Sequence, residues 1–301
     1  MIINRNAFAK ALWPGVNAWF GEGYGELPLQ LTNLFDQHTS YKAFEEDVSV
    51  VGFGMFSQTS ESNPVQFDDM QQGFITRYQH LKYTSGFIIT QEMIDDDQYM
   101  QVASRKAPAL GFAARQTQET VAANLYNRAF NSTYKGGDAK ELLATDHPNA
   151  SGGTFSNELT TAADLSEASL EQAVIDIHNF TNDRGLKIAV QIKCLIIPVQ
   201  LWAEADRILK SPLQYNTADN SINALKMAGS IPVVYMNNYL TDSDAWFLRT
   251  NVPHGLKRWV RKPMTFSEDN DFHTDNLLYK VVYRESYGWS DARGLFGSPG
   301  A

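Results

Sequence analysis

Hydrophobic positions in residues 91–131 recur at helical spacing and predict the longest helix of the chain. Every fourth residue from Ala113 to Leu125 shares one face, among many strong helix formers. The carboxylates of Asp95 to Asp97 lie near the amino end, where they suit the positive end of the helix dipole. Pro108 should kink or divide the helix. A helix of about 40 residues would be about 60 Å long and would act as a strut.

Residues 48–89 have the Val- and Phe-rich pattern of a long β-hairpin. The first limb reads VSVVGFGMFSQ, and the second runs from Phe74 to Thr90. Between them, TSESNPVQFDDMQQG predicts a polar tip that contains Pro64. Because a two-stranded hairpin is not stable alone in water, we expect another part of the protein to support it.

Helices and strands of several lengths alternate in the second half of the chain. SEASLEQAVIDIHNFTNDRG (166–185) predicts an amphipathic helix, capped by Ser166 or Ser169 and ended by Gly185. An alternating strand over 188–198 and a short helix over 201–211 follow. This mixture predicts an α+β fold, and we find no internal repeat. Further strands are predicted at SIPVVYM, AWFLRT, GLKRWVR and NLLYKVVYRESYGW.

Residues 1–47 predict an irregular arm, because the stretch 13–28 contains four glycines and is bracketed by prolines. An extended segment cannot bury large aromatic side chains against itself. We therefore expect these side chains to contact either their own domain or a neighbouring surface. The aromatic residues are Trp13, Trp19, Phe20 and Tyr24.

The composition is that of a folded protein, with 301 residues, 43% hydrophobic and 20% charged. A net charge of −9 argues against a dedicated DNA-binding protein, because phosphate binding normally needs a basic face. The charge is compatible with a protein that encloses DNA without adhering to it. Cys194 is the single cysteine, so no intrachain disulfide is possible. The sequence contains no apolar run of about 18 residues, which predicts no membrane span.

The titratable residues do not predict a catalytic, metal or cofactor site. The six histidines are scattered, and none pairs with another at metal-ligand spacing. The carboxylates of Asp95 to Asp97 would diverge around a helix, which disfavours a cation site. The run GEGYG lacks the strand and the spacing of a phosphate loop. Cys194 alternates with apolar neighbours, which favours an inert core thiol. We therefore expect a protein that is not an enzyme and needs no cofactor.

One basic cluster, KRWVRK, runs from Lys257 to Lys262. It could contact phosphate, with Trp259 stacked on a base. The preferred interpretation is a strand that shows Lys257 and Arg261 on one face, paired with acids of this subunit or another.

Several segments together resemble the major capsid proteins of tailed phages and prophages, including the group related to the Mu major head subunit. They cover most of the C-terminal half in the expected order, and they are specific jointly. The N-terminal third is similar in layout more than in sequence. The segments are LLATDHPNASGGTFSNELT (142–160), LSEASLEQAVIDIHNFTNDRGLKIAV (165–190), IIPVQLWAEADRILKSP (196–212), TADNSINALK (217–226), AWFLRT (245–250), GLKRWVRKP (255–263) and YGWSDARGLFGSPGA (287–301).

The resemblance implies the Hong Kong 97-like capsid fold, an α+β fold with a peripheral and an axial domain. The expected parts are an N-terminal arm (1–47), an extended β-hairpin loop (48–90), the spine helix of the peripheral domain (91–135), the axial domain (136–252), and the return strands of the peripheral domain with a C-terminal tail (253–301).

The resemblance also implies pentamers and hexamers that close into an icosahedral head shell around double-stranded DNA, without tight or sequence-specific binding. The chain would assemble in the bacterial cytoplasm and end in the virion. A portal protein and a possible decoration protein are implied partners. The arm is too short for a built-in scaffolding segment, so we expect a separate scaffolding protein. Lys82 lies on the returning limb of the hairpin and not at its tip, so no crosslink is predicted.

Contacts between subunits are expected at aromatic residues of the arm and hairpin and at cations of the hairpin and the basic cluster. Two alternatives stay open at this stage: another virion protein, such as a decoration or tail component, or a soluble hydrolase. The hydrolase would need a deep polar cleft. The candidate contact residues are Trp13, Trp19, Phe20, Tyr24, Phe53, Phe56, Phe67, Arg77, Lys82, Lys257, Arg258 and Arg261.

Overall fold

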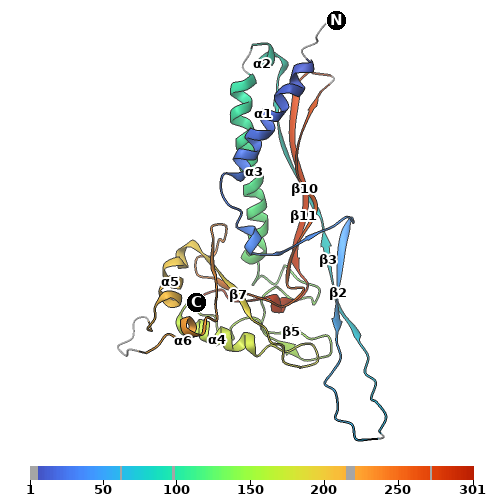
Figure 1. The fold of residues 1–301 in the computed structure, drawn as a ribbon, viewed down its shortest axis with the longest axis vertical. Coiled ribbons are helices and arrows are strands. Elements are labelled where there is room, and N and C mark those ends of the chain that lie inside the picture. Colours follow the sequence, from blue (N-terminus) through green and yellow to red (C-terminus); the bar gives the residue numbers. More distant parts are fainter. Residues whose placement is uncertain (1–5, 62, 97–98, 215–220, 272) are drawn as a thin grey trace.

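The computed structural model describes residues 6–61, 63–96, 99–214, 221–271 and 273–301. Figure 1 shows an elongated molecule with two long helices beside long strands at one end, a mixed α/β body, and a hairpin that projects away from both. Two four-stranded sheets organise it, with strand orders β1-β10-β11-β4 and β12-β9-β7-β8. The structure is therefore α+β, as the pattern predicts.

The first sheet is long and carries helices on one face. Strand β1 pairs parallel with β10, and the other pairs are antiparallel. Side chains of α1 and α3 form a hydrophobic core with this sheet, in which Phe20 stacks on Phe266 with ring centroids 4.7 Å apart. The strands are β1 (Asp36–Thr39), β4 (Leu81–Ile89), β10 (Leu256–Asn270) and β11 (Leu277–Trp289), and the helices are α1 (Asn6–Gly25), α2 (Gln91–Asp95) and α3 (Tyr99–Asn127).

The prediction of an irregular arm is wrong for Asn6–Gly25, which form α1. Two glycines allow α1 and α3 to approach closely. A Cβ at Gly23 would clash with the carbonyl oxygen of Pro108, and one at Gly111 would lie 2.5 Å from the carbonyl oxygen of Phe20. These glycines therefore permit helix packing and do not break the helix.

The predicted long helix is two helices. Thr90 caps α2, its side chain accepting a hydrogen bond from the Met93 amide. Pro108 lies inside α3 and does not divide it, which corrects that part of the prediction. Polar side chains of α3 then hold the segment that follows α1: Glu119 accepts hydrogen bonds from the backbone amides of Gln30 and Leu31, at 2.7 and 3.0 Å.

The predicted hairpin is also divided. Strands β2 (Phe44–Val51) and β3 (Gln71–Gln79) pair with each other, whereas β4 leaves the hairpin and pairs with β11. The second limb is therefore two strands that belong to different sheets. The described residues 52–61 and 63–70 form no strand. Figure 1 shows this part as the far end of the projecting loop.

The second sheet is buried on both faces. Alternate residues of β7, such as Leu195 and Ile196, belong to different hydrophobic clusters. Two covered faces explain the continuous apolar run of this strand, which begins at Ile192 and not at 188. The other elements here are β5 (His147–Pro148), β6 (Thr154–Phe155), α4 (Glu167–His178), β7 (Ile192–Pro198), α5 (Trp202–Lys210), α6 (Ala224–Ala228), β8 (Val234–Asn237), β9 (Trp246–Thr250), β12 (Leu295–Ser298) and the 3-10 turns Leu31–Asn33, Val199–Leu201 and Ala292–Gly294.

The C-terminal segment is not a free tail. Residues of β12 pair antiparallel with β9, and Phe296 is fully buried in the core of the second sheet. The predicted unit 253–301 is thus divided between the two sheets, since β10 and β11 belong to the long sheet and β12 to the other. Small residues make this possible: a Cβ at Gly297 would lie 2.8 Å from the carbonyl oxygen of Trp246.

Candidate assembly surface

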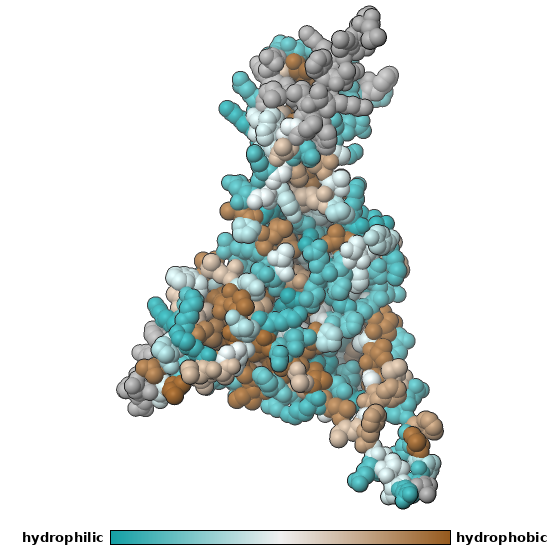
Figure 2. All heavy atoms as spheres, viewed as in Figure 1, coloured by the Kyte–Doolittle hydropathy of each residue, from teal (hydrophilic) through white to brown (hydrophobic). Residues whose placement is uncertain are grey.

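The hairpin tip, residues 52–70, exposes many large apolar side chains. Phe56 is 95% and Phe67 is 97% exposed. Figure 2 shows hydrophobic residues on this projecting end of the molecule. Exposed apolar groups gathered on one projection mark an interaction site, because water solvates them poorly. The exposed apolar residues of the tip are Phe53, Met55, Phe56, Val65, Phe67 and Met70.

The base of the hairpin is fixed to the long sheet by polar contacts. The side chain of Asp47 on β2 accepts hydrogen bonds from Lys257 and Ser290. Burial alone would raise the pKa of Asp47, but these hydrogen bonds and the Lys257 charge lower it. The hydroxyl groups of Tyr78 and Ser290 are 2.7 Å apart. The hairpin therefore leaves the body from a rigid foundation.

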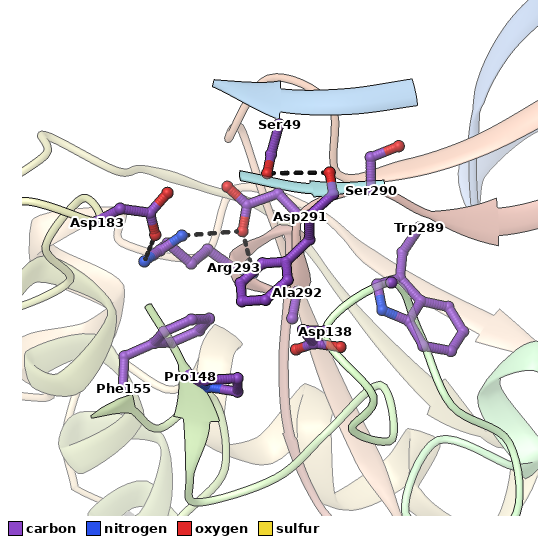
Figure 3. A pocket seen from close by; sticks show the side chains of 12 residues that line it. Ser49, Asp138, Pro148, Phe155, Asp183, Trp289, Ser290, Asp291, Ala292 and Arg293 are labelled. Carbon is purple, nitrogen blue, oxygen red and sulfur yellow. Dashed lines mark hydrogen bonds and ion pairs between the residues drawn. The ribbon is translucent and has the colours of Figure 1, made fainter. Parts of the chain in front are cut away.

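A second joint lies between the hairpin base, the body and the segment after β11. Figure 3 shows Arg293 between Asp183 and Asp291, with Phe155 beside its guanidinium group. The Arg293 guanidinium lies 3.0 Å from Asp183 and 3.3 Å from Asp291, and 3.9 Å from the centre of the Phe155 ring. Burial raises the pKa of Asp291, while the Arg293 charge opposes this.

The cavity at this joint does not have the properties of an active site. It holds about 50 Å³, whereas ligand pockets usually measure about 300–1,000 Å³. Its carboxylates are also engaged: Arg293 pairs with Asp183 and Asp291, and Asp138 lies 2.6 Å from His147. The cluster is a structural joint that fixes three segments of the chain.

Cys194 is buried in the second sheet, and burial raises the pKa of its thiol to about 11. Such a thiol is a poor nucleophile at neutral pH. Among the residues that the structure describes, no group of His, Cys, Asp and Glu is arranged to hold a metal ion. No described helix is long and apolar enough to cross a membrane.

The structure places the predicted contact residues of α1 inward. Phe20 is buried, Trp19 is half-buried against the same core, and the Tyr24 hydroxyl donates to Gln118 at 2.8 Å. The side chain of Trp13 lies outside the described part of the chain. Phe20 thus serves the core of one subunit, which corrects its assignment to contacts between subunits, whereas Tyr24 is half-buried and stays a candidate.

Two cations of the basic cluster are also internal. Lys257 is buried against Asp47, and Arg258 is buried against Glu285 at 2.8 Å. The interpretation of Lys257 as a partner of an acid is confirmed within this subunit, and both residues are removed from the candidate contact set. Arg261 is half-buried, and its Nε donates to the carbonyl oxygen of Lys42 at 2.9 Å.

The hairpin candidates remain accessible. The aromatic residues Phe53, Phe56 and Phe67 are all exposed at the tip. Arg77 lies over the ring of Phe44 at 3.8 Å. Lys82 is exposed on β4, in the long sheet and not in the hairpin. The structure therefore brings the three aromatic candidates together and separates them from the two cations.

The sequence prediction missed three exposed apolar residues of the tip. Val65 and Met70 lie in the segment that was predicted to be polar, and Met55 lies in the predicted first limb of the hairpin. The prediction also missed Arg293 and Asp183, which are far apart in the chain and which no local pattern could pair.

A comparison with curated proteins gives no match. The fold, however, is similar to that of phage capsid chains of known structure. Three similar structures are a chain of the procapsid of bacteriophage JBD30 (14% identity, TM-score 0.51, covering 97% of this chain and 75% of that one), a chain from Mycobacterium phage Patience (11%, 0.53, 98% and 88%) and a chain from Mycobacterium phage Che8 (13%, 0.51, 90% and 90%). The predicted Hong Kong 97-like α+β fold is confirmed.

The family of phage capsid proteins matches residues 74–297, which is most of the chain. The resemblance seen in the sequence is thereby confirmed at the level of this family. This family match excludes the two alternatives, a hydrolase and a tail or decoration protein, and it confirms a structural role. The chain belongs to the family of phage capsid proteins, the proteins that form the shell of the virion head.

Proposed function

We propose that this major capsid protein builds its icosahedral head shell from pentamers and hexamers in which each β2–β3 hairpin lies across a neighbouring subunit. The observation that carries this proposal is the exposed apolar tip on a firmly anchored hairpin. Within its own subunit the tip is contacted by Arg184, which pairs with Asp68 at 3.2 Å and donates to the carbonyl oxygen of Asp69 at 2.6 Å. The apolar side chains of the tip stay exposed, so their burial would accompany assembly. Each square ångström of apolar surface buried contributes about 25 cal/mol.

Contacts of moderate strength suit a shell. Each one remains reversible, so a misplaced subunit can leave, while repetition around a closed surface stabilises the complete particle. The hydrogen bonds that Asp47 accepts from Lys257 and Ser290 support this proposal, because they fix the direction in which the hairpin leaves the body. A defined direction favours one curvature of the shell.

We assign the long sheet with α1 and α3 to the peripheral domain, and the second sheet with α4, α5 and α6 to the axial domain. The expected limits, 91–135 for the spine and 136–252 for the axial domain, remain proposals: α3 ends at Asn127, β9 ends at Thr250, and β12 joins the second sheet from outside these limits. The hairpin loop is better limited to 44–79, since β4 pairs with β11.

The finer family and the partners are also proposals. We infer from the C-terminal segments that the chain is related to the Mu-like major head subunits. A separate scaffolding protein, a portal protein and a decoration protein are its proposed partners. The net charge of −9 supports a wall that encloses double-stranded DNA without binding it tightly.

The proposed role of the hairpin is tested by deleting Ser60–Asp69. We expect the subunit to keep its circular dichroism spectrum and urea unfolding midpoint, because the tip has no core of its own. We expect electron microscopy to show no closed shells when the variant is expressed with the proposed scaffolding protein.

A matched control replaces the same ten positions with Gly and Ser and so keeps the length of the loop. Loss of shells in both variants would assign the effect to the tip side chains. Normal particles from the deletion would contradict the proposed role of the hairpin.

A further inference from the structure

The long sheet has one face without helices, and cations line part of it. The register places Lys82 opposite Arg284 and Arg284 opposite Lys262, so these three residues cross the sheet in one row. Directly opposed residues of antiparallel strands lie on the same face, as do residues two positions apart along a strand. Lys280 therefore belongs to this face too. We call Lys82, Lys262, Lys280 and Arg284 the cationic strip.

Neighbouring residues show which face this is. Tyr83 and Tyr283 stack with ring centroids 5.1 Å apart, and they belong to the core formed with α1 and α3. Because side chains alternate along a strand, Lys82 and Arg284 point to the opposite face. Figure 1 shows α1 and α3 along one side of β10 and β11. The strip thus lies on the side of the sheet away from the helices.

The subunit's own hairpin covers only one end of this face. Trp259 and Ser286 are opposed there, with Tyr78 against Trp259 and His80 hydrogen-bonded to Ser286. In the next pair along this face, Lys257 is neutralised by a hairpin acid, Asp47. Contact between hairpin carboxylates and cations of this face is therefore already used within one subunit.

The cationic strip itself has no such partner. Among the residues that the structure describes, none of its four cations forms an ion pair with a carboxylate. Lys82, Lys262 and Lys280 are exposed and Arg284 is half-buried. Beside them on the same face, Ile88 is 53% exposed. One exposed carboxylate, Asp269, shares this face opposite Leu278 but pairs with none of the four cations. Four cations without an ion-pair partner are unexpected in a chain of net charge −9, and they generate a local positive field.

The hairpin carries the complementary charge. Residues 44–76 contain six carboxylates and no Lys, Arg or His. Three of the six, Glu61, Asp68 and Asp69, lie in the tip among its exposed aromatic residues. A segment that combines carboxylates with apolar side chains matches a face that combines cations with Ile88.

We propose that the cationic strip is the docking surface for the hairpin tip of a second copy of this chain. This inference rests on the proposed function and names the surface that receives the hairpin. The ion pairs would steer the tip and fix its register, and the aromatic residues would supply apolar burial on the same face. The two ends of the face would then both be covered by hairpins, one from the same subunit and one from its neighbour.

Charge reversal tests the pairing directly. Lys82→Glu with Lys280→Glu should lower the yield of closed shells at least about tenfold, since like charges would then oppose each other. Glu61→Lys with Asp69→Lys should have the same effect, and the four substitutions together should restore shells. Asp68 is left unchanged because it accepts a hydrogen bond from the Gly54 amide at 2.8 Å and pairs with Arg184 of its own subunit at 3.2 Å.

Arg105→Glu with Lys135→Glu is the matched control, because it makes the same change in net charge on two exposed residues outside the strip. This control should give shells at the normal yield, and all variants should keep the urea midpoint of the free subunit. Normal shells from Lys82→Glu with Lys280→Glu would overturn the proposed docking surface and leave the proposed shell function intact. This holds even if the amount of DNA packaged per shell decreased. Failure of the fourfold variant to restore shells would overturn it as well. No shells from the unaltered chain would contradict the proposed function itself.

Discussion

The second sheet and the hairpin tip contain the same kinds of residue in opposite situations. In β9 every residue is buried, and Trp246 and Phe247 lie at the centre of two hydrophobic clusters. In the tip, Phe56 and Phe67 are almost wholly exposed. The difference shows that apolar content alone does not say when a side chain is buried. The sheet is completed on folding, whereas we infer that the tip is completed on assembly.

The largest loss of subunit stability is expected from Trp246→Ala in the second sheet. Trp246 is fully buried, and its indole Nε1 donates to the carbonyl oxygen of Ala163 at 3.1 Å. Removing a buried Trp side chain costs about 3–5 kcal/mol through lost burial and the cavity left behind. We expect the free energy of unfolding, measured by urea denaturation of the free subunit, to fall by about that amount.

Trp202→Ala is the control, since Trp202 begins α5 with 55% of its surface exposed. Its unfolding free energy should change by no more than about 1 kcal/mol, because less apolar surface is removed from the interior. Equal losses from the two substitutions would show that the second sheet does not supply the stability of the subunit.

Local signals in the sequence predicted several elements well. Helix α4 begins after Ser166, whose side chain accepts from the Ser169 amide while the Ser169 hydroxyl accepts from the Ser166 amide. Both proposed caps therefore act together, as one capping box. The amphipathic spacing of this helix and the apolar run of β7 are equally local properties. The sequence thus predicted where α4 begins without knowledge of its neighbours, but its predicted end at Gly185 is wrong, since the helix ends at His178 with Asn179 as its C-cap.

Contacts between distant residues could not be predicted in this way. Gly23 of α1 was taken for a helix breaker because its role, the close approach to Pro108, depends on α3. The division of the hairpin depends on the pairing of β4 with β11, almost 200 residues later in the chain. The cationic strip is likewise formed by three strands, β4, β10 and β11, and only their register brings the charges together.

A smaller effect on the unfolding free energy, dependent on pH, is expected from His80, which lies between the hairpin and the long sheet. The side chain of Ser40 donates to Glu45, so His80 Nε2 donates to Ser40 and its Nδ1 accepts from Ser286. Burial lowers the pKa of His80, the nearby Glu45 raises it, and Arg284 and Arg261 lower it further.

The direction of this pH dependence follows from proton binding. Between the lowered pKa and the unfolded value of about 6.5, the unfolded chain binds more protons, so stability rises with pH. We expect the unfolding free energy to fall on acidification from about pH 7 to about pH 5, and to fall less in His80→Gln, which keeps two polar side-chain atoms and does not titrate. Identical pH dependence in the two proteins would contradict a neutral, buried His80.

The smallest effect on subunit stability is expected from Phe56→Ser with Phe67→Ser at the hairpin tip. Their side chains are 95% and 97% exposed, so the unfolding free energy of the free subunit should change by less than about 0.5 kcal/mol. Shell formation should nevertheless fall sharply, because these rings are the apolar surface that assembly would bury. Light scattering during assembly, compared with urea denaturation of the same preparations, separates the two quantities. A loss of stability as large as that of Trp246→Ala would place the tip within the folded core, and normal assembly with normal stability would leave its aromatic residues without a role. Only the combination of unchanged folding and impaired assembly supports a surface that stays uncovered until a second subunit arrives.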